Sequence, residues 1–373
     1  MALVLIMLLS LTSGCLPFVS FAANRLVAGQ PVMLWQMAHG MALLPPLALL
    51  WLLLWARPTG FRCALQLISA GLVLAVMIWL SGDQARLART SFASGMWCGS
   101  ALTLLLITDT ARALTRRRLW QLVLNLLVWI LPLWLLFSGQ LDDLSLLKEY
   151  ANRQSVFDAA LLRHLTLLAA TVLPALPALL IAFPLGIVLY RRSGWQSSVF
   201  GVLNVVQTVP SVALFGLLIA PLAGLAKRFP WAGAWGISGI GMAPALIALV
   251  LYALLPLVRS VVTGLQQVPP DVRESARGMG LSGRQQFFAV EVPLALPVWL
   301  SGIRVVVVQT LGMAVVAALI GAGGFGAIIF QGLLSNALDL VLLGVIPVIA
   351  MAVTLDALFR LLISLLERKD DSV

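Results

Sequence analysis

Charged residues are scarce in this sequence. Only 10% of its 373 residues are Asp, Glu, Lys or Arg, whereas 61% are hydrophobic. A soluble domain carries about 25% charged residues, which cover its surface. The shortage therefore excludes an ordinary water-soluble enzyme. Apolar runs long enough to cross a bilayer recur along the whole chain, so we expect most of this protein to be surrounded by lipid.

Residues for metal or redox chemistry are also few. The three cysteines, Cys15, Cys63 and Cys98, lie in or beside apolar runs, and no two are spaced as CxxC. With only two histidines in addition, neither a disulfide framework nor a metal site is expected, and the thiols are predicted to be buried. The phosphate-binding pattern GxxxxGK[ST] is absent, so we expect no cofactor in this chain and no ATP hydrolysis by it.

Ten apolar segments are predicted to span the membrane. Each is long enough, at about 1.5 Å per residue, to cross roughly 30 Å of hydrocarbon. The first has no basic stretch before it, so we expect a retained membrane helix and not a cleaved signal peptide. The segments cover about residues 2–22, 38–55, 63–81, 92–110, 119–138, 165–190, 199–222, 242–262, 298–320 and 340–366.

The positive charge gives an orientation for this map. The net charge is +10, but no basic patch with stacking aromatic residues is present, which argues against nucleic acid as a partner. Lys and Arg instead fall in short loops, where they favour the cytoplasmic side. If both termini are cytoplasmic, 16 of the 24 basic residues lie inside. We therefore predict that both termini of this multi-pass protein are cytoplasmic.

The chain divides into two halves. Residues 1–138 contain five predicted spans joined by short loops and form an N-terminal membrane extension. Residues 139–164 are polar and amphipathic, and the map places this linker outside. Residues 165–366 contain five more spans with longer loops between them, and residues 367–373 form a cytoplasmic tail.

The cytoplasmic loop of residues 263–297 carries the most informative pattern. Pro270 suits the first position of a short helix, and Gly280 suits the turn after it. Ser282 followed by Gln285 is a capping box that predicts a second helix. Proline at position 293 then ends the loop and leads into the next span. A long, charged, helical loop in a membrane protein indicates a docking element.

This loop resembles the EAA loop of binding-protein-dependent ATP-binding cassette (ABC) importer permeases. That pattern reads Glu-Ala-Ala, three residues, Gly, nine residues and Ile-x-Leu-Pro. Glu274, Ala276, Gly280 and Pro293 match it, and Ser275 replaces the middle alanine. The resemblance implies an all-α polytopic protein of the bacterial inner membrane, with a type I ABC importer (MetI-like) permease core in its C-terminal half. It also implies that these five residues form the ATPase-coupling loop.

Three other stretches resemble the permeases for glycine betaine, choline and proline betaine. They are residues 208–219, 245–259 and 318–326, and the similarity covers roughly residues 160–366. Residues 1–138 depart from the shorter permeases and match a longer subgroup with such an extension. The resemblance implies osmoprotectant import by alternating access. Its implied partners are cytoplasmic ABC ATPase subunits that bind the ATP, an extracytoplasmic substrate-binding protein, and a second permease chain, identical or paralogous.

Several neutral polar residues lie inside the predicted spans, and two interpretations of them stay open. They either line a translocation path, which would suit a zwitterion with little net charge, or make hydrogen bonds between helices. These residues are Asn204, Gln207, Thr208, Ser211, Gln309 and Thr310.

Two motifs with other meanings are given less weight. Gly321, Gly323 and Gly326 fit the dinucleotide pattern GxGxxG, but the apolar run before them is too long for a sheet strand, so an external turn or close helix packing is expected. Asp356 is predicted to pair with Arg360 four residues later. Without midplane carboxylates or inverted repeats, an ion-coupled secondary transporter is the weaker alternative. An ABC permease for another small polar solute, such as an amino acid, is a further one.

Overall fold

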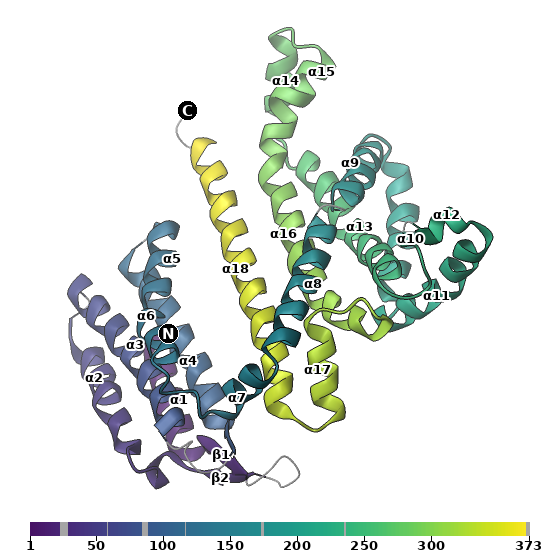
Figure 1. Ribbon diagram of the computed structural model, residues 1–373. Coiled ribbons are helices and arrows are strands. Elements are labelled where there is room, and N and C mark those ends of the chain that lie inside the picture. Colours follow the sequence, from purple (N-terminus) through teal and green to yellow (C-terminus); the bar gives the residue numbers. More distant parts are fainter. Residues whose placement is uncertain are drawn as a thin grey trace. The chain divides into compact units, whose positions relative to one another are not determined.

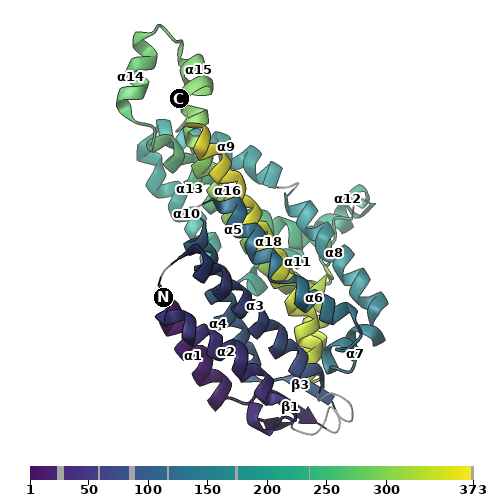
Figure 2. The same ribbon diagram turned by 90° about the vertical axis from the view of Figure 1, so that its left-hand side faces the viewer.

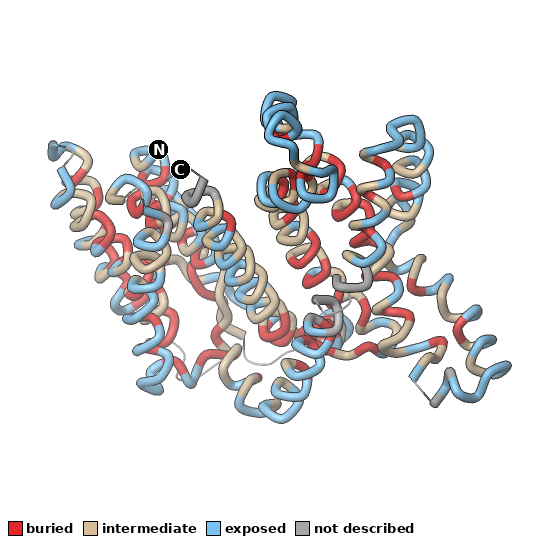
Figure 3. The backbone as a smooth tube through the Cα atoms, turned by 90° about the horizontal axis from the view of Figure 1, so that it is seen from above, coloured by how far each residue is buried: buried red, intermediate tan, exposed pale blue. Residues whose placement is uncertain are grey.

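The computed structural model describes residues 1–22, 29–57, 59–83, 89–115, 117–172, 175–234 and 236–370. The chain divides into two compact units, each built mainly of helices (Figure 1). The first unit contains Met1–Gln154 together with Ser335–Leu340. The second contains Ser155–Leu334 and Val341–Val373. Within each unit, buried residues follow one face of most helices and exposed residues the other (Figure 3).

The first unit is assembled around one long helix. This helix, α3, packs against α2, α4 and α6, and α1 packs against α4. The helices are α1 (Ala2–Cys15), α2 (Leu44–Trp55), α3 (Gly60–Asp83), α4 (Ser94–Leu114), α5 (Arg118–Leu127), α6 (Ile130–Phe137) and α7 (Ser145–Asn152), with short 3-10 turns η1 (Leu34–Gln36) and η2 (Gly40–Leu43) before α2.

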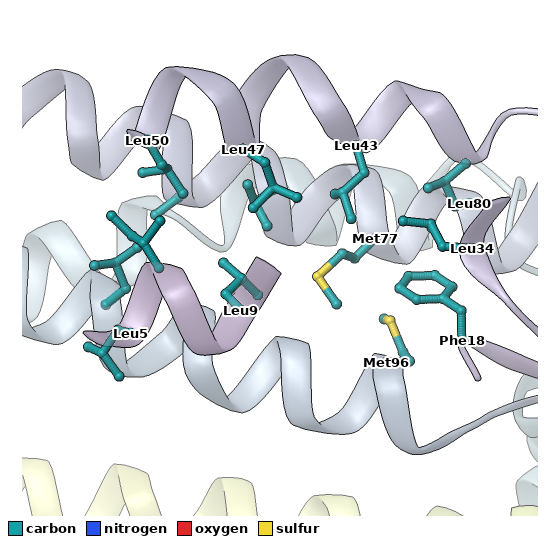
Figure 4. Close-up of a cluster of buried hydrophobic side chains, with 14 of the residues drawn as sticks. Leu5, Leu9, Phe18, Leu34, Leu43, Leu47, Leu50, Met77, Leu80 and Met96 are labelled. Carbon is teal, nitrogen blue, oxygen red and sulfur yellow. The ribbon is translucent and has the colours of Figure 1, made fainter. Parts of the chain in front are cut away.

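Leucine and methionine side chains fill the core of this unit. Leu9, Leu43, Leu50, Met77 and Phe18 are each completely buried (Figure 4). Four of them come from α1, η2, α2 and α3, and Phe18 lies just before β1. Flexible methionine side chains fill irregular gaps between such elements. The first unit therefore has its own packed core.

A small antiparallel sheet corrects the all-α prediction. Strands β1 (Val19–Ala22), β2 (Gln30–Val32) and β3 (Arg89–Phe92) lie in the order β2-β1-β3. Val19 pairs with Val32 on one side and with Phe92 on the other. The predicted segment 2–22 thus ends as a helix at Cys15 and continues as a strand. The apolar run hid this change, because β-branched and aromatic residues suit both a strand and a membrane span.

The second unit is built around α13 (Met242–Gln266), which packs against α9 and α16 along its length and also touches α10 and α11. Its other helices are α8 (Gln154–Val172), α9 (Ala175–Arg191), α10 (Gln196–Thr208), α11 (Ser211–Arg228), α12 (Pro230–Ala234), α14 (Pro270–Gly278), α15 (Gly283–Gln286), α16 (Val292–Ala317), α17 (Phe325–Leu334) and α18 (Leu338–Asp370). A 3-10 turn, η3 (Ser193–Trp195), precedes α10.

Small residues let these helices approach closely. A Cβ atom placed on Gly186 of α9 would lie 2.6 Å from Val261 Cγ1 of α13, closer than van der Waals contact allows. A Cβ atom placed on Gly302 of α16 would lie 2.3 Å from Ser260 Oγ, which also belongs to α13. Small residues at helix interfaces are typical of membrane proteins, where van der Waals packing drives association. The seam of α9, α13 and α16 is therefore the rigid centre of the unit.

Six helical stretches in the described part of the chain are long and apolar enough to cross a membrane. They are Gly60–Gly82, Leu119–Phe137, Ser211–Arg228, Met242–Gln266, Gly283–Ile320 and Leu338–Leu366. Shorter apolar helices accompany them, including Ala2–Cys15 and Gly40–Trp55. The protein is thus mostly helical with six such stretches, and the finer map of ten spans stays a prediction. Predicted span 165–190 passes through residues outside the described ranges.

Two details of the sequence-based map are wrong. The predicted span 199–222 is broken, because α10 ends at Thr208 and α11 begins at Ser211 after Pro210. Proline lacks the N–H that would continue the helix. Cys15 and Cys98 are exposed and not buried, and Cys63 is partly exposed. These thiols lie on helix faces that point away from the unit's own core.

Candidate coupling loop and transport path

The loop after α13 forms the two short helices predicted from its sequence. Helices α14 and α15 lie together at one end of α16 (Figures 1 and 2). Pro270 begins α14, as expected for a residue with no N–H to donate. The capping box is confirmed: Ser282 Oγ accepts from the Gln285 N–H at 3.4 Å, and Gln285 Oε1 accepts from the Ser282 N–H at 2.9 Å. Local sequence therefore predicts where both helices of this loop begin.

Gly280 ends α14 with a left-handed turn. Its φ of 80° lies in the region that favours glycine, as its position predicted. The Gly280 N–H donates to the Arg277 carbonyl at 2.9 Å, and the Leu281 N–H donates to the Ala276 carbonyl at 3.2 Å. This pair of hydrogen bonds is the Schellman motif, which satisfies the last carbonyls of a helix. The turn therefore holds α14 at a fixed angle to α15.

The five residues of the EAA pattern are divided between the inside and the surface of this loop. Ala276 is buried, whereas Glu274, Ser275 and Gly280 are exposed on α14 and the turn after it. Pro293 is also exposed, in the first turn of α16. The arrangement presents a carboxylate and a hydroxyl outward on a helix whose alanine faces inward. Such a surface is available for docking.

A π-helical turn, η4 (Phe287–Glu291), joins α15 directly to α16, which the sequence analysis missed. The loop's second helix therefore runs on into the span, and Pro293 does not end it as expected. The Val292 N–H reaches back five residues to the Phe287 carbonyl. Pro293 has no N–H for a normal helical bond, and this was the signal for an irregular turn. Turns of this kind are rare and are frequent at functional sites.

Glu291, the last residue of the π turn, is buried within a polar network. Only 9% of the residue is exposed. The Gln286 Nε2 donates to Glu291 Oε1 at 3.0 Å, and Arg273 Nε lies 3.7 Å from the same oxygen. Arg277 Nε donates to Gln286 Oε1 at 3.4 Å. The network connects α14, α15 and the π turn.

The first group of predicted path residues lies at the break between α10 and α11. Asn204 is exposed, and Ser211 begins α11. The Gln207 Nε2 donates to the Tyr252 carbonyl of α13 at 2.9 Å, while Thr208 Oγ1 donates to the Val205 carbonyl at 2.7 Å within its own helix. For Gln207 this is the hydrogen bond between helices that the sequence left open as an alternative.

The second group lies on α16. Thr310 is buried, and its hydroxyl donates to the Val307 carbonyl at 3.0 Å. The Gln309 Nε2 makes a weak contact with Met313 Sδ at 3.9 Å. Both side chains therefore have a partner inside α16. No observation of the described residues assigns either group to a translocation path, so that assignment stays a prediction.

Tyr252 is a functional candidate that the sequence analysis overlooked. Its hydroxyl donates to the Val209 carbonyl at the break between α10 and α11. With the bond from Gln207 to the Tyr252 carbonyl, it fixes this break against α13 from both sides. A single tyrosine in an aliphatic span was the available signal. Buried tyrosine hydroxyls usually have a partner.

The glycine-rich motif is a tight turn after α16. Gly321, Gly323 and Gly324 have φ values of 82°, 80° and 79°. A Cβ atom placed on Gly326 would lie 1.9 Å from the Val315 carbonyl oxygen, so α17 and α16 approach as closely as backbone allows. The interpretation as a turn with close packing is confirmed.

The ion pair of Asp356 and Arg360 is confirmed and extended. Arg360 Nη2 lies 2.5 Å from Asp356 Oδ2, and Arg304 Nε of α16 lies 2.6 Å from Asp356 Oδ1. Two guanidinium groups thus compensate one carboxylate. A proton relay needs a carboxylate that is free to be protonated and released, and two arginine partners oppose this.

Family models match both halves of the chain. Residues 163–369 match the model described as binding-protein-dependent transport system inner membrane component. Residues 1–147 match the model described as the N-terminal domain of the ABC transporter permease YehY.

Several curated proteins are similar to the C-terminal half. The osmoprotectant import permease protein OsmW of Salmonella typhimurium is 38% identical over 183 residues, which cover 49% of this chain and 80% of that protein. The glycine betaine/carnitine/choline transport system permease protein OpuCB of Bacillus subtilis is 35% identical over 178 residues, covering 48% and 75%. A solved inward-facing form of the methionine ABC transporter MetNI matches with a TM-score of 0.48 and 20% identity, covering 56% of this chain and 96% of that one.

Proposed function

Because the chain belongs to the binding-protein-dependent inner-membrane transport components, we propose that it is the membrane-spanning subunit of an ATP-driven osmoprotectant importer. It is a transport subunit and not an enzyme. The observation that carries this proposal is the rigid loop at the end of α16. Its capped helices present Glu274 and Ser275 outward and keep Ala276 inside.

The substrate class follows from the relatives. The similar proteins are named for osmoprotectants, glycine betaine, carnitine and choline. These solutes carry a quaternary ammonium group and, except for choline, a carboxylate. Neutral polar residues such as Asn204 and Ser211 would suit such a solute, because a fixed charge on the path would trap it. Strong recognition of the ammonium by aromatic rings belongs to a separate binding protein.

The partners follow from the same family. A substrate-binding protein outside the membrane would deliver the solute. A second permease chain, identical or paralogous, would complete the path. Two cytoplasmic ATPase subunits would hold the coupling loop (residues 263–297) and bind the ATP. Transport by alternating access requires that ATP and solute bind the two states with different affinity.

The orientation of the chain is part of the proposal. Both termini and the coupling loop would be cytoplasmic, and the linker 139–164 would be outside, between an extension of residues 1–138 and a core of residues 165–366. Labelling of single cysteines at Asp143 and Met279 with an impermeant maleimide tests this, after Cys15, Cys63 and Cys98 are replaced by serine. Asp143 and Met279 have exposed side chains, whereas Ser145 is buried and unsuitable. Labelling at Asp143→Cys from the cytoplasmic side alone would invert the map.

The function is tested at Glu274. The variant Glu274→Lys reverses an exposed charge that would meet a donor on the ATPase. We expect normal membrane insertion, loss of the ATPase in a pull-down, and a fall in uptake by vesicles of at least about tenfold. The matched control Asp143→Lys reverses an exposed charge in the linker and should retain uptake. Full uptake and normal ATPase association of Glu274→Lys would contradict the proposed function.

A further inference from the structure

One arginine at the base of the coupling loop contacts α9, α13 and the π turn that leads into α16. Arg273 lies on α14. Its Nη2 donates a hydrogen bond to the Leu265 carbonyl in the last turn of α13. Its guanidinium carbon lies 5.5 Å from the centre of the Tyr190 ring, in the last turn of α9. Its Nε faces Glu291 in the π turn that leads into α16.

The contact between Arg273 and Glu291 joins opposite charges that are both largely buried. The Glu291 side chain is 12% exposed and that of Arg273 is 20% exposed. A buried carboxylate without a cation nearby is unfavourable, and Arg273 supplies that cation beside Glu291. The contact is also longer than a hydrogen bond. The distance of 3.7 Å exceeds the 2.7–2.9 Å or so of a charge-assisted hydrogen bond, and the buried Nε makes no hydrogen bond with the described residues.

The partner of Arg273 lies where α16 is least regular. Glu291 ends the π turn, and the turn replaces normal helical bonds with one that reaches back five residues. A helix changes direction more easily at such a turn than within a regular stretch. A shift of α14 that shortens the Arg273–Glu291 contact would therefore pull on the first turn of α16.

We propose that Arg273 is a positioning residue that transmits the movement of α14 to the ends of α9, α13 and α16. This inference rests on the proposed function and adds to it. The outer face of α14 docks the ATPase, and Arg273 on its inner side conveys the resulting displacement to the membrane helices. Docking and transmission are thus assigned to different residues of one short helix, which allows them to be separated by experiment.

The test uses the assembled transporter with its ATPase and binding protein. In Arg273→Met, we expect the ATPase to remain in the pull-down within about twofold, because the docking face is unchanged. Uptake should fall at least about tenfold, and ATP hydrolysis should no longer depend on the binding protein. The control Arg192→Met removes another arginine that stacks on an aromatic ring, at 5.3 Å from the centre of Trp195, outside the coupling loop. It should leave all three measurements unchanged.

The double variant Arg273→Met/Glu291→Met separates positioning from simple stability. Removing both charges leaves no buried carboxylate unpaired, so the loop should fold and bind the ATPase normally. If the arginine only stabilises the loop, the double variant regains uptake, and the proposal is overturned. If it transmits movement, uptake stays low. Loss of the ATPase from the pull-down of the double variant would also overturn it, because docking and transmission would then be inseparable. Either of these results for the double variant would leave the proposed function intact. The proposed function itself would be contradicted only by full uptake and normal ATPase association of Glu274→Lys.

Discussion

Two arginines, Arg89 in the first unit and Arg273 in the second, face buried carboxylates at different distances. In the first unit, Arg89 Nη2 contacts Glu149 Oε1 at 2.9 Å and Asp339 Oδ2 at 3.1 Å, and Arg89 Nε donates to Ser145 Oγ at 2.9 Å. Ser91 Oγ donates to the same Asp339 oxygen at 3.0 Å. These four contacts have hydrogen-bond length, whereas Arg153 Nε lies 3.7 Å from the other oxygen of Glu149. In the second unit, the corresponding contact of Arg273 with Glu291 is stretched to 3.7 Å.

We call the Arg89 contacts the fixed joint and the Arg273–Glu291 contact the movable joint, because we expect only the second to change length during transport. The partners of Arg89 are 60 and 250 residues away in the sequence, and both carboxylates are buried. Asp339 lies in the range that matches the transport family, whereas Arg89 lies in the range that matches the N-terminal domain. The short contacts of Arg89 connect segments of the first unit that are distant in the sequence. The longer distance between Arg273 and Glu291, just before α16, leaves room for these two side chains to approach each other.

The largest effect is expected from breaking the fixed joint. The variant Arg89→Met leaves two buried carboxylates beside each other and should lower the free energy of unfolding by about 3–5 kcal/mol. The measurement is thermal unfolding of the purified protein in detergent. Lys148→Met is the matched control, because Lys148 pairs with Asp143 at 3.0 Å but both are about half exposed. It should cost less than about 1 kcal/mol. Equal losses in the two variants would show that the cluster does not act as a joint.

A smaller effect is expected from the apolar core beside that joint. The Met77 side chain is completely buried among residues of several helices, so Met77→Ala should leave a cavity and cost about 2–3 kcal/mol. Leu52→Ala, at a residue 69% exposed, should change stability by only about 0.5 kcal/mol. The same unfolding experiment compares them. If the exposed site proves as costly as the buried one, the first unit has no core of its own.

A change in stability no larger than that of Met77→Ala, but a loss of transport, is expected at the Gly280 turn beside the movable joint. Gly280→Val forces a branched side chain into a left-handed conformation, at a local cost of about 1–3 kcal/mol. The strain would tilt α14, so uptake by vesicles should fall further than in Met77→Ala, although the loss of stability is no larger. Gly278→Val introduces the same side chain two residues earlier, where the backbone is helical and space is open, and should reduce uptake less. Equal uptake by both variants would indicate that the angle of α14 is unimportant.

Local features of this protein could be predicted from the sequence, and distant contacts could not. The capping box of Ser282 and Gln285 and the turn at Gly280 depend on neighbouring residues, so their spacing suffices. The contact between Arg89 and Asp339 crosses 250 residues, and no local pattern reveals it. The strand at Val19 was hidden in an apolar run, because membrane spans and strands share their residue types. Pro210 did mark the break between α10 and α11, but its neighbours on both sides were apolar.

The coupling loop shows the same division within one site. Glu274 and Pro293 could be placed by pattern because the resemblance fixes their spacing. Arg273 lies beside Glu274 in the sequence, yet its role depends on Tyr190 and Glu291, which come from other helices. The π turn was also missed, since the proline that accompanies it is compatible with an ordinary helix start.

The break between α10 and α11 also affects the order in which contacts form while the chain is synthesised. Helix α10 has 13 residues and spans only about 20 Å, so it is too short to cross a bilayer alone. The end of α10 is fixed against α13 by Tyr252, whose hydroxyl donates to the Val209 carbonyl 43 residues earlier in the chain. At a synthesis rate of about 5–20 residues per second, Tyr252 follows roughly 2–9 s after Val209. During that interval α10 has been synthesised but lacks its tyrosine partner, so the break between α10 and α11 can reach its final arrangement only after α13 has been made.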